Sequence, residues 1–342
     1  MEKIAGLTRQ DTAVGWYRII NPIIFIGKTG VKYATNRFSG QNEVATFSQK
    51  DSGPFLEDGT LMKIAKGADV IWTTMIYDFD EILKILDLRR WSGAKWVVDI
   101  DDDLYNVSSD NPARKNVDAL KHNMETCLKL ADGITVSVPL LVDTYKHLNP
   151  NIYVNYNGQS VEDWDKLRTK YKNKKIRIGW RGASGHNADV ALVRPALEEL
   201  KKKYDIEFVT LGVEPPFKTE HHGWVSTMDF PKTLASLKLD IGLVPLIDKP
   251  YNRCKSNIAV QEFSMLKIPV VASPVENQKD MPVLYASTNY DWYEQIEKLI
   301  LDEKLRRSQR EKAYHFVSKK YDMKKLTKPL IKWMDNLLRK DI

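Results

Sequence analysis

Lysine, serine and glutamate occur in close succession in the segment YNRCKSNIAVQEFSMLKIPVVAS, residues 251–273. Lys255 and Ser256 stand directly before an apolar-periodic stretch that predicts a helix, and Glu262 lies about two turns further along. A helix start offers unpaired backbone N–H groups and a positive dipole end, which suit a phosphate. Glu262 would then lie at a suitable distance from the phosphate to accept hydrogen bonds from ribose hydroxyls. The segment predicts one half of a nucleotide-sugar site; the structural alternative for Glu262 is a loop cap or a lysine partner.

The segment RGASGHNAD, residues 181–189, follows an apolar run that predicts a strand over 176–180. Its glycines, Gly182 among them, would let a diphosphate approach backbone N–H groups, although a plain turn accounts for them equally well. Arg181 would add a permanently charged, bidentate contact. Arg181 and Lys255 together would flank one diphosphate and stabilise the charge that grows on a departing phosphate.

Four aspartates fall within five residues in DIDDDLYN, residues 99–106, at the end of a predicted buried strand. Crowded carboxylates repel one another, so one of Asp101, Asp102 and Asp103 is expected to have a raised pKa and to be usable as a base. The functional interpretations are a general base on an acceptor hydroxyl, a carboxylate that binds the acceptor, or a clamp for a divalent metal. The structural alternative is that Asp103 caps a following helix while the others are solvated.

The segment AVGWYRIINP, residues 13–22, follows the first predicted strand. Gly15 would permit a tight turn there. Tyr17 and Arg18 would then point toward an acceptor or a diphosphate. Packing of the whole segment into a core is an equal alternative.

Short apolar runs alternate with helical patterns throughout the chain, which favours parallel sheets covered on both faces. The sequence therefore predicts an α/β fold of two tandem, Rossmann-like, doubly wound domains that face each other across a cleft. The expected organisation is a first domain over 1–160, a basic linker over 161–175, a second domain over 176–320 and a C-terminal helix over 321–342. The expected strands are 3–7, 70–74, 96–100, 133–137, 152–155, 176–180, 206–211, 240–244 and 268–272.

The run VQEFSMLKIPVVAS, residues 260–273, resembles the signature of the retaining GT-B glycosyltransferases of family four, where a glutamate precedes an apolar patch and a Pro-Val-Val strand. Asn157-Gly158 resembles the end of the first domain in these enzymes. Acidic runs such as Asp99–Asp103 are familiar in a phage and bacterial subset. The C-terminal helix, with Pro329 as a kink, resembles the bent helix that crosses back onto the first domain.

The resemblance implies a glycosyltransferase, hexosyl or pentosyl, that takes a UDP-linked sugar as co-substrate. It implies that Arg181, Gly182, Lys255, Ser256 and Glu262 hold the donor. It also implies that no cofactor and no metal are required, because cations replace the metal at the diphosphate. The implied acceptor, bound by the first domain, is a glycan, a lipid-linked precursor or a modified base in duplex DNA, and closure of the domains would exclude water.

Composition and charge limit the cellular compartment and the partners that are expected for this protein. The sequence has no long apolar window for a transmembrane helix and no apolar segment near its start for secretion, and its two cysteines form no disulfide framework, so a cytoplasmic protein is expected. The net charge of +7 is concentrated in residues 165–177 and the last forty residues, where an anionic surface is a possible partner. Two other classes stay open: a sugar-nucleotide epimerase of the same fold and a non-catalytic nucleic-acid-binding protein.

Overall fold

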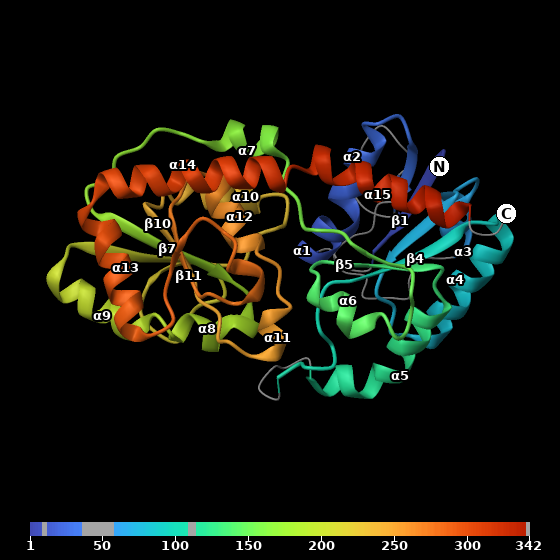
Figure 1. The fold of residues 1–342 in the computed structure, drawn as a ribbon, viewed down its shortest axis with the longest axis horizontal. Helices are drawn as coiled ribbons and strands as arrows, with labels where there is room; N and C mark the ends of the chain where they lie inside the picture. The colour runs from blue at the N-terminus through green and yellow to red at the C-terminus, as the bar shows by residue number, and fades with distance from the viewer. Residues whose placement is uncertain (9–11, 36–57, 109–113, 340–342) are drawn as a thin grey trace. The chain divides into compact units, whose positions relative to one another are not determined.

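The computed structural model describes residues 1–8, 12–35, 58–108 and 114–339. The chain divides into two compact units (Figure 1). Unit 1 comprises Met1–Gly158 and Met323–Ile342, and unit 2 comprises Gln159–Asp322. Within the described residues each unit is built on one six-stranded sheet whose paired strands all run parallel.

The sheet of unit 1 has the strand order β2-β1-β3-β4-β5-β6. Its four inner strands, β1, β3, β4 and β5, are short and almost wholly buried, as expected for a sheet covered by helices on both faces. The strands are β1 (Lys3–Leu7), β2 (Lys32–Thr35), β3 (Val70–Thr74), β4 (Lys95–Ile100), β5 (Gly133–Val136) and β6 (Ile152–Val154). The helices are α1 (Ala13–Gly15), a π-helix (Trp16–Ile20), α2 (Asn21–Gly27), α3 (Asp58–Ala65), α4 (Phe79–Ser92), α5 (Arg114–Leu130), α6 (Leu140–Tyr145) and α15 (Met323–Leu338).

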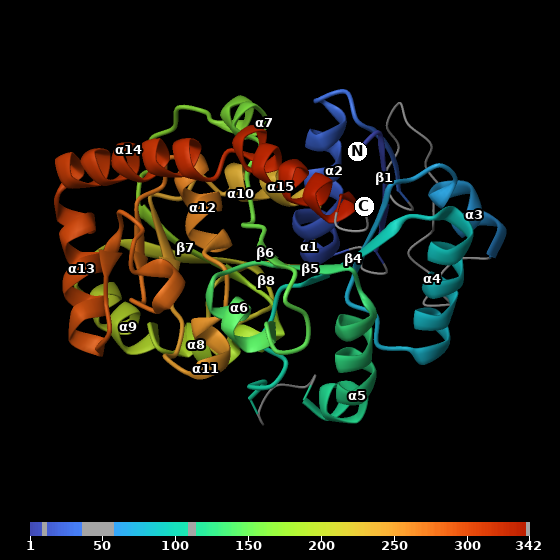
Figure 2. The same ribbon diagram turned by 45° about the vertical axis from the view of Figure 1, so that its right-hand side comes forward.

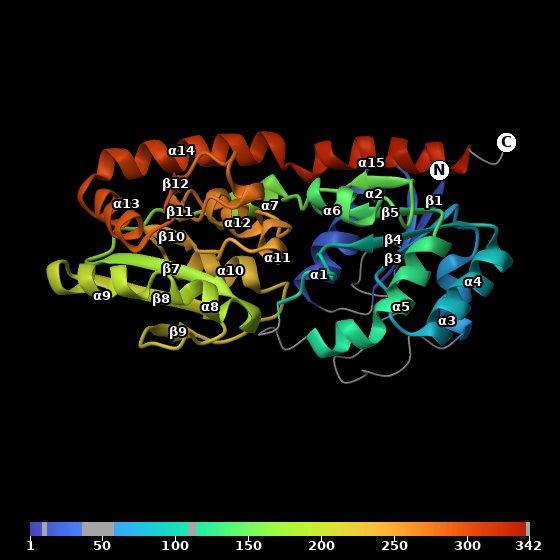
Figure 3. The ribbon, with the colours of Figure 1, turned by 60° about the horizontal axis from the view of Figure 1, so that its bottom comes forward.

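The C-terminal helix α15 is part of the core of unit 1. Its apolar residues Leu330, Met334 and Leu337 pack with Ile23 of α2 and Trp72 of β3. Figure 3 shows α2 and α15 on one side of β3 and β4, and α4 and α5 on the other. The helix spans Met323–Leu338, within the expected range 321–342, and contains Pro329 in its interior.

The sheet of unit 2 has the strand order β12-β11-β10-β7-β8-β9. Its strands are β7 (Ile176–Gly182), β8 (Ile206–Gly212), β9 (Glu220–His222), β10 (Ile241–Val244), β11 (Val270–Ala272) and β12 (Leu284–Tyr285). Its helices are α7 (Val161–Leu167), α8 (Asn187–Ala191), α9 (Arg194–Lys203), α10 (Phe230–Ser236), α11 (Pro250–Arg253), α12 (Ile258–Met265), α13 (Asn289–Leu301) and α14 (Glu303–Lys320), with 3-10 turns at Ser184–His186 and Glu276–Gln278.

Helices cover both faces of this second sheet. Leu200 of α9 and Ile296 of α13 belong to one buried cluster with Ile178 of β7. Phe263 of α12 lies so close to β10 that a Cβ at Gly242 would come within 2.8 Å of its ring. The absence of a side chain at Gly242 therefore lets α12 pack directly on the sheet.

The structure differs from the expected basic linker over 161–175. Residues Val161–Leu167 form α7, and Trp164 in it is buried. The Trp164 Nε1–H donates to Gln159 Oε1 over 2.7 Å, and Tyr171 donates to the carbonyl of Leu239. The lysines of this segment are solvated, but its aromatic residues attach it to unit 2.

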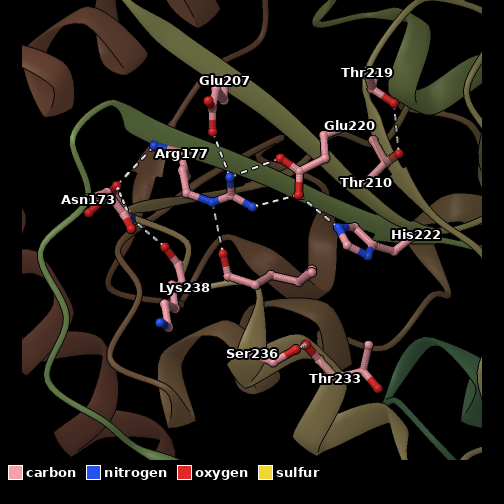
Figure 4. Close-up of polar contacts among 12 residues, drawn as sticks. Asn173, Arg177, Glu207, Thr210, Thr219, Glu220, His222, Thr233, Ser236 and Lys238 are labelled. Carbon is pink, nitrogen blue, oxygen red and sulfur yellow. Dashed lines mark hydrogen bonds and ion pairs between the residues drawn. The ribbon is translucent and has the colours of Figure 1, made fainter.

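An ion-pair network lies at the amino ends of β7 and β8. Arg177 Nη1 lies 2.6 Å from Glu207, and its Nη2 lies 2.8 Å from Glu220, which also pairs with His222 at 2.8 Å (Figure 4). Arg177 Nε donates to the carbonyl of Leu237 over 3.0 Å. Because this end of a parallel sheet is opposite to the end where ligands bind, the network is a structural feature.

Candidate functional site

The carboxyl end of β7 carries Arg181 and Gly182 as the last two residues of the strand. Gly182 lies opposite Gly212 of β8 in the register of the sheet. A Cβ at Gly182 would lie 2.3 Å from the Trp180 ring, and one at Gly212 would lie 2.3 Å from the Gly182 carbonyl oxygen. Close packing therefore requires glycine at both positions: the Trp180 ring lies against Gly182, and the two strands approach closely at Gly212.

Arg181 and Glu262, two residues predicted to contact a nucleotide sugar, form an ion pair. Glu262 lies on α12, and its side chain is only 2% exposed, whereas that of Arg181 is 19% exposed. The guanidinium also lies 5.7 Å from the centroid of the Phe230 ring of α10. A partly exposed cation and a buried carboxylate thus lie next to each other at the end of β7.

Lys255 and Ser256 lie between α11 and α12, with Asn257 as the residue that precedes α12. The Lys255 Nζ donates to the Tyr251 hydroxyl over 3.0 Å and lies 4.4 Å from the centroid of that ring. Strand β10, which leads into this connection, pairs in parallel with β7. Arg181, at the end of β7, and Lys255, on the connection after β10, therefore lie at the same edge of the sheet.

A buried chain of amides fixes the start of α12. Asn257 donates to the Tyr321 hydroxyl over 2.8 Å and accepts from Gln261 over 2.6 Å. Gln261 in turn accepts from Gln159 over 3.2 Å. Because Asn257 directly follows Ser256, this network fixes the position of the Lys255–Ser256 turn.

Asp189 is a functional candidate that sequence reasoning missed. This residue of α8 is buried, and its Oδ2 lies 2.8 Å from Nδ1 of His186. Its Oδ1 accepts from the Ile247 N–H over 2.8 Å and from the Asn252 amide over 3.0 Å. Figure 2 shows α8 and α11 side by side. The one signal in the sequence was an aspartate three residues after a histidine, a spacing too common to single out.

The segment after β1 differs from the expected loop. Gly15 has helical dihedral angles, φ −55° and ψ −42°, so it makes no tight turn, and α1 continues into the π-helix and α2. Tyr17 is buried, and Arg18 is completely buried. The Arg18 guanidinium binds Asp99 through Nε–Oδ1 at 2.9 Å and Nη2–Oδ2 at 2.8 Å, and it donates to Asn157 Oδ1 over 2.8 Å. The structure thus uses Arg18 to neutralise Asp99 inside unit 1.

The aspartates after β4 take different positions. Asp103 is buried, and its carboxylate accepts from the N–H groups of Tyr105 and Asn106 over 3.1 and 3.3 Å and from the Asn106 amide over 2.7 Å. Asp103 thus caps its own turn and not a following helix. Asp101 and Asp102 are partly exposed. We call residues 101–106 the acidic turn.

Hydroxyl groups from the neighbouring strand and helix hold the backbone of the acidic turn. Ser137 donates to the Asp101 carbonyl over 3.0 Å, and Tyr145 donates to the Asp102 carbonyl over 2.8 Å. The Tyr145 oxygen also accepts from the Leu104 N–H over 2.9 Å. Burial raises the pKa of Tyr145, so its hydroxyl stays protonated at neutral pH and can keep donating.

Two further properties concern the described residues only. Among them no three His, Cys, Asp or Glu side chains are arranged to hold a metal ion. None of the helices in the described ranges combines the length and apolar character needed to cross a membrane.

The chain matches one family model and many solved structures. Residues 190–332 match the family described as "Glycosyl transferase-like". An alpha-glucosyltransferase in complex with UDP and a mismatched 13-mer DNA matches with a TM-score of 0.70 at 13% identity, over 97% of this chain and 99% of that one. The DNA-modifying enzyme beta-glucosyltransferase matches with a TM-score of 0.60 at 13% identity and the same coverage.

A protein of another activity also shares the fold. A putative UDP-N-acetylglucosamine 2-epimerase from Listeria monocytogenes matches with a TM-score of 0.56 at 10% identity, over 96% of this chain and 95% of that one. No match to the chain was found among curated proteins. At these identities the structures establish the fold, and the predicted pair of Rossmann-like domains of the GT-B type is confirmed.

Proposed function

We propose that this protein is a glycosyltransferase that moves a sugar from a UDP-linked donor to an acceptor hydroxyl. The observation that carries the proposal is the Arg181–Glu262 pair at the carboxyl end of β7, beside the connection that bears Lys255 and Ser256. Ligands of doubly wound sheets bind at this edge. The family model over residues 190–332 covers Lys255, Ser256 and Glu262.

The charges at this edge suit a nucleoside diphosphate. Arg181 offers a planar set of N–H donors, and Lys255 offers a point charge, for oxygens whose negative charge increases as the glycosidic phosphate leaves. Glu262 would accept from ribose hydroxyls, for which a buried carboxylate is a strong acceptor. Gly182, the last residue of β7, would offer its backbone to the diphosphate at this edge.

The acidic turn is the proposed source of the catalytic base. A carboxylate of Asp101 or Asp102 would take the proton of the acceptor hydroxyl while the acceptor oxygen bonds to the anomeric carbon and the bond from that carbon to the UDP oxygen breaks. Asp103 has a different role in this scheme. Its three hydrogen bonds make it the residue that shapes the turn.

The proposed acceptor is a hydroxyl on a modified base in duplex DNA. The net charge of +7 supports a polyanionic acceptor. Similar folds occur in an alpha-glucosyltransferase bound to DNA and in a DNA-modifying beta-glucosyltransferase. A glycan acceptor would give turnover without DNA, and an epimerase would convert the nucleotide sugar without any acceptor.

The proposal is tested by thermal unfolding with UDP and a panel of nucleotide sugars, followed by transfer assays with the stabilising donor. UDP is expected to stabilise the wild type. Lys255→Ala should weaken UDP binding by about ten- to a hundredfold, the equivalent of one charge-assisted hydrogen bond. Lys201→Ala, on the exposed face of α9, is the matched control and should bind UDP normally. Normal UDP binding by Lys255→Ala would refute the diphosphate assignment.

A further inference from the structure

An imidazole–carboxylate pair lies at the same edge of the sheet as Arg181. His186 ends the 3-10 turn that follows β7, and its Nδ1 lies 2.8 Å from Asp189 Oδ2. The His186 side chain is 30% exposed and that of Asp189 is 3% exposed. A buried carboxylate therefore orients a histidine that is accessible to solvent.

Asp189 also fixes the connection that carries Lys255. Its second oxygen accepts from the Ile247 N–H and the Asn252 amide, and that amide also donates to the Ile247 carbonyl over 3.0 Å. The Lys255 N–H donates to the Asn252 carbonyl over 3.1 Å. One carboxylate thus ties the connection after β7 to the connection after β10, and it places the imidazole in a fixed relation to the Lys255 turn.

We propose that His186 is a protonation-dependent ligand for an anionic group bound at this edge, and that Asp189 is its positioning residue. The inference rests on the proposed function, in which that group is the donor diphosphate. A neutral imidazole that donates Nδ1–H to Asp189 has only a lone pair at Nε2, which repels an anion. The imidazolium keeps the bond to Asp189 and presents Nε2–H to the ligand, so binding takes up one proton.

Histidine supplies the change of charge at this edge. By residue type, an imidazole is the group that titrates near neutral pH, and the other charged side chains on the surrounding connections are arginine, lysine, aspartate and glutamate. These side chains come from β7, from the connection after β10 with α11, and from α12: Arg181, Asp248, Lys249, Arg253, Lys255 and Glu262.

The test is the affinity for UDP, measured by calorimetry from about pH 6 to about pH 8.5. The wild type should lose affinity as the pH rises, by up to about tenfold per pH unit once the free imidazole is neutral. His186→Lys, whose charge is permanent in this range, should bind at high pH and lose that dependence. His186→Gln should bind weakly throughout. The terminal phosphate of UDP also titrates near pH 6, so the measured quantity is the difference between wild type and His186→Lys.

A matched control is His222→Gln, because His222 also pairs with a carboxylate at 2.8 Å, but on the outer strand β9. Its pH profile should equal that of the wild type. Asp189→Asn should move the wild-type profile to lower pH, since the imidazolium loses its anionic partner, and thermal unfolding at each pH will show that this variant is folded.

The outcomes separate this inference from the proposed function. If the wild type binds UDP and His186→Lys has the same pH profile, the proposed role of His186 is wrong and the proposed donor site is unaffected. Absence of UDP binding by the wild type at every pH would overturn both. A proton uptake on binding that persists in His186→Gln would also overturn the assignment of the proton to His186.

Discussion

Arg18 and Asp99 form a bidentate ion pair in which neither side chain is exposed by more than 1%. The pair joins the π-helix to the carboxyl end of β4, and Arg18 also donates to Asn157 near the end of the first part of unit 1. Thr135 of β5 donates to the same carboxylate over 2.5 Å. Both charged groups make several hydrogen bonds, which is the condition under which a buried pair is tolerated.

Asp99→Asn is expected to destabilise the protein by about 3–5 kcal/mol, because it leaves the Arg18 charge buried without a counter-charge. Urea unfolding followed by tryptophan fluorescence measures the change. The matched control is Asp87→Asn, whose ion pair with Arg90 is largely exposed and should contribute roughly 0–1 kcal/mol. Equal stability of the two variants would contradict the structural role of Arg18.

Arg181→Lys and Glu262→Gln are expected to separate the two ends of the donor. Arg181→Lys keeps the charge but loses the planar fork of donors, so the affinity for both UDP and inorganic diphosphate should fall by about tenfold. Glu262→Gln should weaken the affinity for UDP, because the ribose is its proposed ligand. It should not weaken the affinity for inorganic diphosphate, because the loss of the Glu262 charge leaves the Arg181 cation without that neutralising partner. Calorimetric titration with the two ligands gives the comparison. A loss of diphosphate binding in Glu262→Gln would contradict the assignment of the Glu262 carboxylate to the ribose.

Asp102→Asn and Asp103→Asn are expected to differ. Asp102→Asn should reduce turnover by about a hundred- to ten-thousandfold, the usual effect of losing a general base, with UDP affinity unchanged. Asn at position 103 retains an oxygen for the Tyr105 and Asn106 N–H groups, so the turn and most of the turnover should survive. Single-turnover assays with saturating donor measure both. If both variants keep full turnover, Asp101→Asn becomes the decisive variant for the acidic turn.

Glu220 is expected to make stability depend on pH in the acid range. The hydrogen bond from Arg177 lowers the pKa of Glu220 to about 2, below its ordinary value. A lowered pKa in the folded state contributes stability above the ordinary value of about 4.3, and that contribution is lost as the pH falls toward 2. Thermal unfolding between those limits should show a smaller decline in Glu220→Gln than in wild type. Parallel curves for the two proteins would argue against the network in Figure 4.

Gly212→Ala is expected to destabilise unit 2 by roughly 1–3 kcal/mol. Gly212 has a φ of +108°, and an added Cβ would lie 2.3 Å from the Gly182 carbonyl oxygen. Gly223→Ala is the control, because nothing lies within 4 Å of a Cβ at that position and its φ is not positive. Thermal unfolding measures both variants. Wild-type stability of Gly212→Ala would show that the two strands can separate at this edge without cost.

The sequence alone determined the layers of the fold. Predominantly apolar runs such as Val70–Thr74 and Ile241–Val244 are strands because a short run of this kind has to be buried on both faces of a sheet. The position of Lys255 and Ser256 before a helix followed from local periodicity in the same way. The positions of these strands and of this helix depend mainly on residues that are close in the sequence, so they could be predicted from the sequence.

Tertiary structure decided which charges meet. Arg18 and Asp99 are 81 residues apart, and His186, Asp189 and Asn252 come from two connections of the sheet. A local pattern shows that a side chain is charged but not whether packing will bury it against an opposite charge. Arg18 was therefore expected to contact a ligand and instead neutralises a buried carboxylate. Asp189 carried only a common spacing in the sequence, and its partners are brought together by the sheet.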